Sequence, residues 1–200
     1  MDLQISVLLL FILFTTGHSL SCYECTSLKG SCTDQKVKTC PRGSSMCSSS
    51  TSVTQSADTT AKIKVKDCAA VCASGSLNLG ILKKSSVCCN TDQCNTQDAP
   101  DPRTDSNGKT CYYCDGKSCS NTLKCSGSED RCITATGSFG DQSLVVKGCA
   151  SKSICDVKSP ATDVQSITCC EGNLCNGDSK SVTQSFRFLC CFLLSFILLH

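Results

Sequence analysis

Cysteine supplies almost all of the reactive side chains in this sequence. The 200 residues include 22 cysteines but only two histidines, His18 and His200, which lie in the apolar segments at the two ends. The region between them therefore has no imidazole for a zinc site, a nucleophilic triad or a general base near neutral pH. Cysteines at this density indicate an oxidising compartment and disulfide formation. We therefore predict no catalytic residue, no metal ligand and no cofactor.

Twenty of these cysteines form two blocks of ten with matching spacing. Both blocks begin C-Y-x-C, both have six residues between the fourth and fifth cysteines, both reach K-x-C-A, and both end C-C-x4-C-N. The three motifs start at Cys22, Lys66 and Cys88 in the first block and at Cys111, Lys147 and Cys169 in the second. Such a repeat indicates two copies of one domain.

Each predicted domain is too small and too poor in aromatic residues to build an adequate hydrophobic core. Only Tyr23, Tyr112, Tyr113 and Phe139 lie between the terminal apolar segments. Domains of this size need covalent cross-links, and closing a loop such as 40–68 is worth roughly 3 to 4 kcal/mol in the chain-entropy model. Spacing alone does not select the pairing, although we expect each block to close on itself.

The domain boundaries follow from the cysteine-free segment between the blocks. Residues 97–108 contain two prolines, three aspartates and no large apolar residue, which predicts a solvated, partly extended linker. We assign residues 20–96 to domain 1 and residues 109–177 to domain 2. Domain 1 carries nine Lys or Arg against five Asp or Glu and is mildly basic, whereas domain 2 is balanced at seven against seven.

The two ends of the chain have the character of processing signals. The apolar run at residues 7–14 is too short to span a bilayer, and we predict a signal peptide at residues 1–19, with a buried helix as the alternative. The apolar residues 186–200 are also short for a span. Together with the small residues and polar spacer before them, they predict a glycosylphosphatidylinositol (GPI) attachment signal.

On this interpretation residues 178–200 are a propeptide and Gly177 receives the lipid, which leaves an eight-residue spacer. Asn176 and Ser179 are the other candidates for the lipid site. A tail-anchored span or a buried helix remains the alternative for the apolar tail.

The cysteine pattern resembles the lymphocyte-antigen-6/urokinase-receptor (LU) family of three-finger domains, over residues 20–176 except the linker. The resemblance implies an all-β, small disulfide-rich fold of two tandem three-finger domains, each a disulfide hub with three β-hairpins. It also implies that Asn95 and Asn176 tie each C-terminus to its hub. The implied pairs are Cys22–Cys47, Cys25–Cys32, Cys40–Cys68, Cys72–Cys88, Cys89–Cys94, Cys111–Cys132, Cys114–Cys119, Cys125–Cys149, Cys155–Cys169 and Cys170–Cys175.

The chain departs from the urokinase receptor within this family. That receptor has three such domains, and its first lacks the disulfide that corresponds to Cys72–Cys88. Urokinase binding is therefore not implied for this chain.

Three features are candidate partner-binding sites. Lys62, Lys64 and Lys66 alternate with apolar residues on an expected strand, so they either meet an acidic protein or sulfated glycan or keep a strand face soluble. Leu77 and Leu79 make the third fingertip apolar, either as a contact site or through packing against the hub or the other domain.

Phe139, between glycines at residues 137 and 140, is expected at the central fingertip of domain 2. An aromatic side chain there is either an anchor for a partner or locally packed.

We therefore expect a binding protein without chemistry of its own, attached by a GPI lipid to the outer leaflet of the plasma membrane. The family resemblance implies an extracellular protein or membrane receptor as partner, with a role in reception, adhesion or receptor modulation. Nothing in the sequence indicates nucleic-acid binding. The alternative is a secreted two-domain inhibitor or modulator that resembles the serum phospholipase inhibitors.

Overall fold

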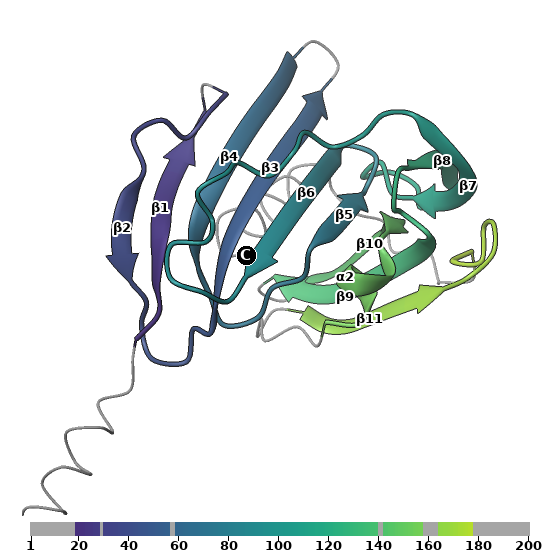
Figure 1. Cartoon of the computed structure of the whole chain (residues 1–200). Helices are drawn as coiled ribbons and strands as arrows, with labels where there is room; N and C mark the ends of the chain where they lie inside the picture. Colours follow the sequence, from purple (N-terminus) through teal and green to yellow (C-terminus); the bar gives the residue numbers. More distant parts are fainter. Residues whose placement is uncertain (1–18, 29, 57–58, 140–141, 158–163, 178–200) are drawn as a thin grey trace, which may run out of the picture.

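The computed structural model describes residues 19–28, 30–56, 59–139, 142–157 and 164–177 (Figure 1). Most of the predicted signal peptide and all of the predicted propeptide, residues 178–200, lie outside this set. Within the described residues, no helix combines the length and the apolar character needed to cross a membrane.

Domain 1 consists of three antiparallel hairpins in chain order. The sheet order is β5-β6-β3-β4-β1-β2, so the second hairpin lies between the other two. Period-two alternation suits these strands, because successive side chains point to opposite faces of the sheet. The strands are β1 Ser21–Ser27, β2 Lys36–Thr39, β3 Met46–Ser56, β4 Thr59–Ala69, β5 Gly75–Asn78 and β6 Leu82–Cys89.

Domain 2 repeats this plan with two differences. A short helix ends at its seventh cysteine, before the third finger, and the first hairpin forms a two-stranded sheet of its own. The residues that match β5 by their distance from the seventh cysteine, 158–161, lie outside the described set. The first strand of domain 2 begins inside the predicted linker. The elements are β7 Ser106–Tyr113, β8 Asn121–Ser126, β9 Arg131–Phe139, β10 Gln142–Ala150, α2 Lys152–Cys155 and β11 Val164–Cys170.

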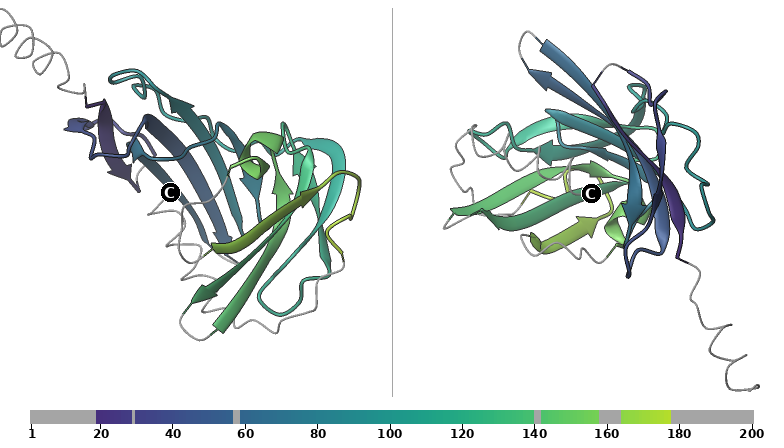
Figure 2. Two further views of the ribbon diagram at one scale, coloured as in Figure 1. Left: turned by 90° about the horizontal axis from the view of Figure 1, so that it is seen from below. Right: turned by 90° about the vertical axis from the view of Figure 1, so that its left-hand side faces the viewer.

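A single curved sheet of nine strands runs through both domains (Figure 2). Its order is β11-β9-β10-β5-β6-β3-β4-β1-β2, and the domains join where Cys149 and Ala150 of β10 pair with Asn78 and Leu77 of β5. Gly148 permits this approach, because a Cβ atom there would collide with the carbonyl oxygen of Asn78. The two domains are therefore one continuous structure at this junction.

The largest apolar cluster lies between the domains rather than inside either one. Three leucines of the third hairpin of domain 1 pack with four apolar residues of domain 2. The members are Leu77, Leu79, Leu82, Ile133, Leu144, Val146 and Ala150. Each domain thus contributes part of a core that neither is large enough to form alone. The predicted all-β fold of two tandem three-finger domains is confirmed.

Candidate binding surface

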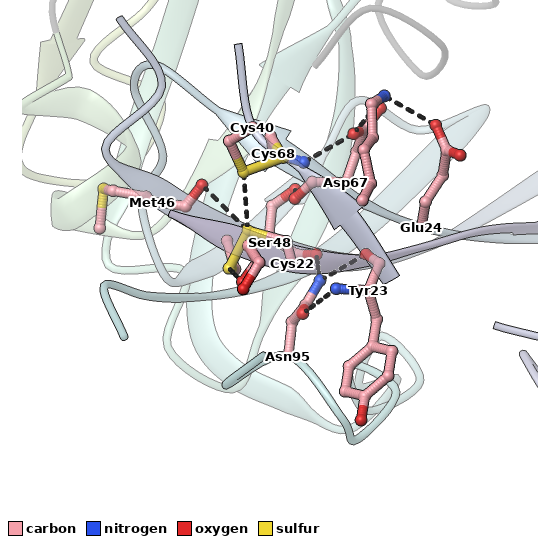
Figure 3. Close-up of a disulfide and its surroundings, with 12 residues drawn as sticks. Cys22, Tyr23, Glu24, Cys40, Met46, Ser48, Asp67, Cys68 and Asn95 are labelled. Carbon is pink, nitrogen blue, oxygen red and sulfur yellow. Dashed lines mark hydrogen bonds and ion pairs between the residues drawn. A yellow bond between two sulfur atoms is a disulfide. The ribbon is translucent and has the colours of Figure 1, made fainter. Parts of the chain in front are cut away.

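The disulfides build two equivalent hubs. All ten bonds join the pairs that the family resemblance implies. In each hub two disulfides lie in contact. The sulfurs of Cys22 and Cys40 are 3.2 Å apart in the first hub (Figure 3), and those of Cys111 and Cys125 are 3.4 Å apart in the second. The hubs hold the roots of the hairpins together, and therefore position the fingertips.

Two clusters of cysteine sulfurs are compact enough to suggest a metal site. Each takes three cysteines from a hub, namely Cys22, Cys40 and Cys68 in domain 1 and Cys111, Cys125 and Cys149 in domain 2. All six sulfurs belong to disulfides. A metal-binding cysteine must supply a thiolate, so the clusters have a structural role.

An asparagine closes each hub through three hydrogen bonds. The Asn95 side chain accepts a hydrogen bond from the backbone amide of Tyr23 at 2.9 Å and donates to the carbonyl oxygens of Tyr23 and Ser48 (Figure 3). Asn176 makes the same three bonds with the amide and carbonyl of Tyr112 and the carbonyl of Ile133. The amide group suits this position because it can donate and accept at once.

A buried lysine forms a second tie that the sequence reasoning missed. The ammonium group of Lys66 donates to the carbonyl of Thr96, the residue directly after Asn95. The ammonium group of Lys147 donates to the carbonyl of Gly177, directly after Asn176, at 3.1 Å. Both lysines belong to the repeated K-x-C-A motif, so that motif was the available signal.

The linker lies on the lysine-bearing face of β4. The ammonium nitrogen of Lys62 lies 2.5 Å from Asp101, and those of Lys64 and Lys66 lie 3.2 and 3.1 Å from Asp98. Ala99, which lies between these two aspartates in the chain, is buried. Its backbone carbonyl accepts a hydrogen bond from the Thr51 side chain of β3, and its amide donates to the Ser49 side chain of the same strand. The expectation of a solvated linker is thus wrong for this part, although most linker residues remain exposed.

The same contacts determine the charge state of Asp98. Burial of the carboxylate alone would raise its pKa. Hydrogen bonds from Lys66, Lys64 and the backbone amide of Cys32 lower the pKa by more than burial raises it, so the pKa lies below its ordinary value. The Lys66 side chain is 1% exposed and that of Asp98 is 21% exposed. The candidate basic ridge is therefore paired within the molecule, and Lys62 is its most exposed member.

The apolar third fingertip of domain 1 lies against domain 2. Leu77 and Leu79 are both buried in the cluster between the domains. At the turn beyond them, Gly80 has a φ of +82°, and a Cβ atom there would collide with the ring of Tyr113 in domain 2. Of the two interpretations of these leucines, the structure supports packing against the neighbouring domain rather than an exposed contact site.

The exposed apolar surface lies elsewhere among the described residues. Leu28 is 73% exposed and Val37 is 55% exposed, and both belong to the first finger of domain 1. Sequence reasoning missed them because single apolar residues on a short hairpin have no distinguishing periodicity. The backbone of Phe139 ends β9 opposite Gln142, while its side chain lies outside the described residues.

This combination of disulfide hubs, asparagine ties and radiating hairpins defines a class of extracellular three-finger proteins. The model of the family "Snake toxin and toxin-like protein" matches residues 20–95 and again residues 110–176. The chain belongs to this family, with two tandem copies of its domain, as the resemblance to LU domains implied.

Several known proteins are similar to the chain. The urokinase plasminogen activator surface receptor of Rattus norvegicus is 38% identical over 104 residues, which is 44% of this chain and 32% of that protein. The receptor of Mus musculus is 29% identical over 194 residues, which is 82% of this chain and 56% of that protein. The chain thus spans between a third and somewhat over half of these relatives.

A second group of relatives has a better match in length. A phospholipase A2 inhibitor gamma subunit of Gloydius brevicaudus siniticus is 29% identical over 166 residues, which is 73% of this chain and 81% of that protein. Among solved structures, that of mouse TEX101 aligns with 77% of this chain and 99% of its own at 17% identity and a TM-score of 0.34.

Proposed function

We propose that this protein is a GPI-anchored binding protein of the cell surface, which contacts an extracellular protein or membrane receptor through its fingertips. The observation that carries this proposal is the exposure of two apolar residues on the first finger, Leu28 just beyond β1 and Val37 on β2 opposite Tyr23, while the hub fixes the root of that finger. Rigid scaffolds with exposed loops are typical of binding proteins. Phe139 and the exposed end of the lysine ridge at Lys62 are further candidate contacts.

The lipid anchor is the most direct part of this proposal to test. The full chain is expressed in animal cells, and the intact surface is treated with phosphatidylinositol-specific phospholipase C. Release that depends on the enzyme supports the anchor. Retention despite active enzyme contradicts it and indicates a tail that remains in the membrane.

A matched pair of variants tests the attachment site. Gly177→Leu combined with Ser179→Leu removes two of the small residues that attachment requires. Thr183→Ala combined with Gln184→Ala changes the spacer and leaves the site intact. Surface protein should fall strongly for the first pair only, and equal surface levels would reject this site.

The proposed contacts of the first finger are tested once a partner has been captured. Leu28→Ser and Val37→Ser remove apolar contact area, whereas Val87→Ser changes an apolar residue of similar exposure on β6. Binding should weaken for the first two variants and not for the third. Equal binding by all three would assign the contact to another surface.

The secreted inhibitor remains a second candidate because of the length match. The chain covers 81% of a phospholipase A2 inhibitor subunit but no more than 56% of the urokinase receptors described above. Spontaneous appearance of the protein in untreated medium would favour this alternative.

A further inference from the structure

The lipid site expected from the sequence, Gly177, is held against the hub of domain 2. The ammonium group of Lys147, a residue that is 1% exposed, donates to the carbonyl of Gly177 at 3.1 Å. A Cβ atom on Gly177 would lie 3.1 Å from the ring of Tyr112 and 3.5 Å from the carbonyl oxygen of Leu174. A lipid attached at Gly177 would therefore be joined to the hub without a flexible stem.

The loop 171–174 adjoins this site, and all four of its residues are exposed. The amide of Leu174 donates to the carbonyl of Thr110 on β7 at 2.8 Å, and the side chain of Asn173 accepts from the Thr110 amide at 3.1 Å. Leu174 has a φ of +56°, and 37% of the residue is exposed. The loop backbone is thus fixed to β7, and its one apolar side chain reaches the surface.

The equivalent loop of domain 1 has the same backbone arrangement. Residues 90–93 occupy the four variable positions of the C-C-x4-C-N motif that residues 171–174 occupy in domain 2. The amide of Gln93 donates to the carbonyl of Ser21 at 2.7 Å, and the Asp92 carboxylate accepts from the Ser21 amide at 2.8 Å. Gln93 has a φ of +54°. The two loops can therefore be compared position by position.

The chemistry of the two loops differs. Asn173 stands where domain 1 has an aspartate, and Leu174 stands where domain 1 has a glutamine. The loop of domain 2 contains one charged residue, Glu171, whose carboxylate lies 2.7 Å from the guanidinium group of Arg131. A lipid interface favours apolar side chains and disfavours unpaired charges. The changes that suit such an interface occur in the domain with the expected lipid site and not in the other.

We infer that, in the lipid-anchored protein proposed above, the loop 171–174 lies on the membrane surface with the Leu174 side chain among the lipid headgroups. This contact rests on the proposed anchor at Gly177. A neutral phosphatidylcholine surface fits the loop, because its headgroups offer an opposite charge to both members of the Glu171–Arg131 pair. One leucine binds a bilayer weakly by itself, but an anchor beside it keeps the loop at the surface, so the contact fixes the orientation of domain 2.

Tryptophan fluorescence provides a matched test, because the chain contains no tryptophan. Leu174→Trp and Gln93→Trp place the same reporter at equivalent exposed positions of the two loops. Each full chain is expressed in animal cells, and the lipidated protein is purified in detergent and reconstituted into phosphatidylcholine vesicles with brominated acyl chains. The emission of Leu174→Trp should shift to shorter wavelength and be quenched, whereas that of Gln93→Trp should do neither. Equal quenching of both variants, or quenching of neither, overturns the inference.

Flotation of the same vesicles separates the contact from the anchor. Protein that floats with the vesicles and is released by phosphatidylinositol-specific phospholipase C retains the anchor, so an unquenched Leu174→Trp in that protein rejects the contact alone. Protein that does not float contradicts the anchor and the contact together.

Hydrogen exchange tests the wild type without an added aromatic side chain. The backbone amides of residues 171–174 should exchange more slowly in vesicles than after release by the phospholipase, while those of residues 90–93 should exchange equally in both states. Equal exchange of residues 171–174 in the two states, or the same slowing in both loops, contradicts a membrane contact made by the loop of domain 2.

Discussion

Strands β4 and β10 occupy the same place in the two domains but have different neighbours. In domain 1 the outer edge of β4 pairs with β1, through Cys25 opposite Lys66 and the two following pairs. In domain 2 the same edge of β10 pairs with β5 of domain 1, and among the described strands β7 pairs only with β8. One cysteine framework therefore supports two arrangements of its first finger.

The difference depends on the residue that directly precedes the sixth cysteine of each block. In the K-x-C-A motif the variable residue is Asp67 in domain 1 and Gly148 in domain 2. The Asp67 carboxylate accepts hydrogen bonds from the Cys68 amide and the Lys38 ammonium group. Gly148 has no side chain, so the carbonyl of Asn78 can approach its backbone. The cysteines determine the hub, and the residue at this position of the motif determines which strand pairs with β4 or with β10.

The largest predicted effect tests whether the hubs are equivalent. Removing Cys22–Cys47 or Cys111–Cys132 by double alanine substitution should lower the free energy of unfolding by about 3 kcal/mol each, because both bonds close loops of similar length. The short loop of Cys114–Cys119 should cost about 2 kcal/mol. Secreted yield and thermal unfolding provide the measurement, and a much smaller loss in one hub would break the equivalence.

The asparagine ties should also be equivalent. Asn95→Ala and Asn176→Ala each leave three backbone groups without their partner, so each should destabilise the protein by about 2 kcal/mol. Denaturant unfolding measures the change. Asn90→Ala, at an exposed position beside the first hub, is the control and should have little effect.

The junction between the domains is tested by Gly148→Ala. The added methyl group would collide with the carbonyl of Asn78, so the β5–β10 pairing should weaken at a cost of about 1 to 3 kcal/mol. Hydrogen exchange at Leu77 and Asn78 should accelerate, while exchange within the hubs is retained. The control Asp67→Ala should cost about 1 kcal/mol and leave exchange at Leu77 unchanged, since it removes an exposed ion pair with Lys38 and a hydrogen bond from the Cys68 amide, both within domain 1. Unchanged exchange at Leu77 would show that the strand pairing does not require glycine at position 148.

The smallest effect concerns the linker. The pKa of Asp98 is lower in the folded protein than its ordinary value, so its contribution to stability is present above the unfolded pKa and is lost as the pH falls through the folded pKa. Asp98→Asn should therefore destabilise the protein by about 1 kcal/mol at neutral pH. It should also make the free energy of unfolding depend less steeply on pH below about pH 4. The exposed Asp101→Asn should change neither quantity measurably. The same pH dependence of the free energy of unfolding for wild type and Asp98→Asn would contradict this role.

The sequence predicts the parts of the fold that cysteine spacing controls. Two matched blocks of ten cysteines specify two hubs, and the asparagine after each last cysteine lies where the family resemblance places it. The arrangement between the domains depends on tertiary contacts instead. Leu77 and Leu79 have the same apolar character whether they meet a partner or domain 2, so sequence pattern leaves the choice open.

Local composition predicted that most linker residues are exposed but did not predict the contacts of Asp98 and Ala99. Prolines and aspartates suit a solvated segment, but Asp98 lies opposite Lys64 and Lys66 only after the chain has turned back from the hub. The short helix α2 was likewise not predicted, because four residues are too few for a helical period to show in the sequence.

The asparagine ties have a mechanical consequence. The strand that enters each hub and the segment that leaves it are bonded directly to each other, through Tyr23 and Asn95 in the first hub and Tyr112 and Asn176 in the second. Tension applied along the chain therefore passes from hub to hub through adjacent points of entry and exit. The hairpins lie to the side of this path. Tension applied to either end of the protein would therefore leave the shape of the fingers unchanged until a hub itself unfolded.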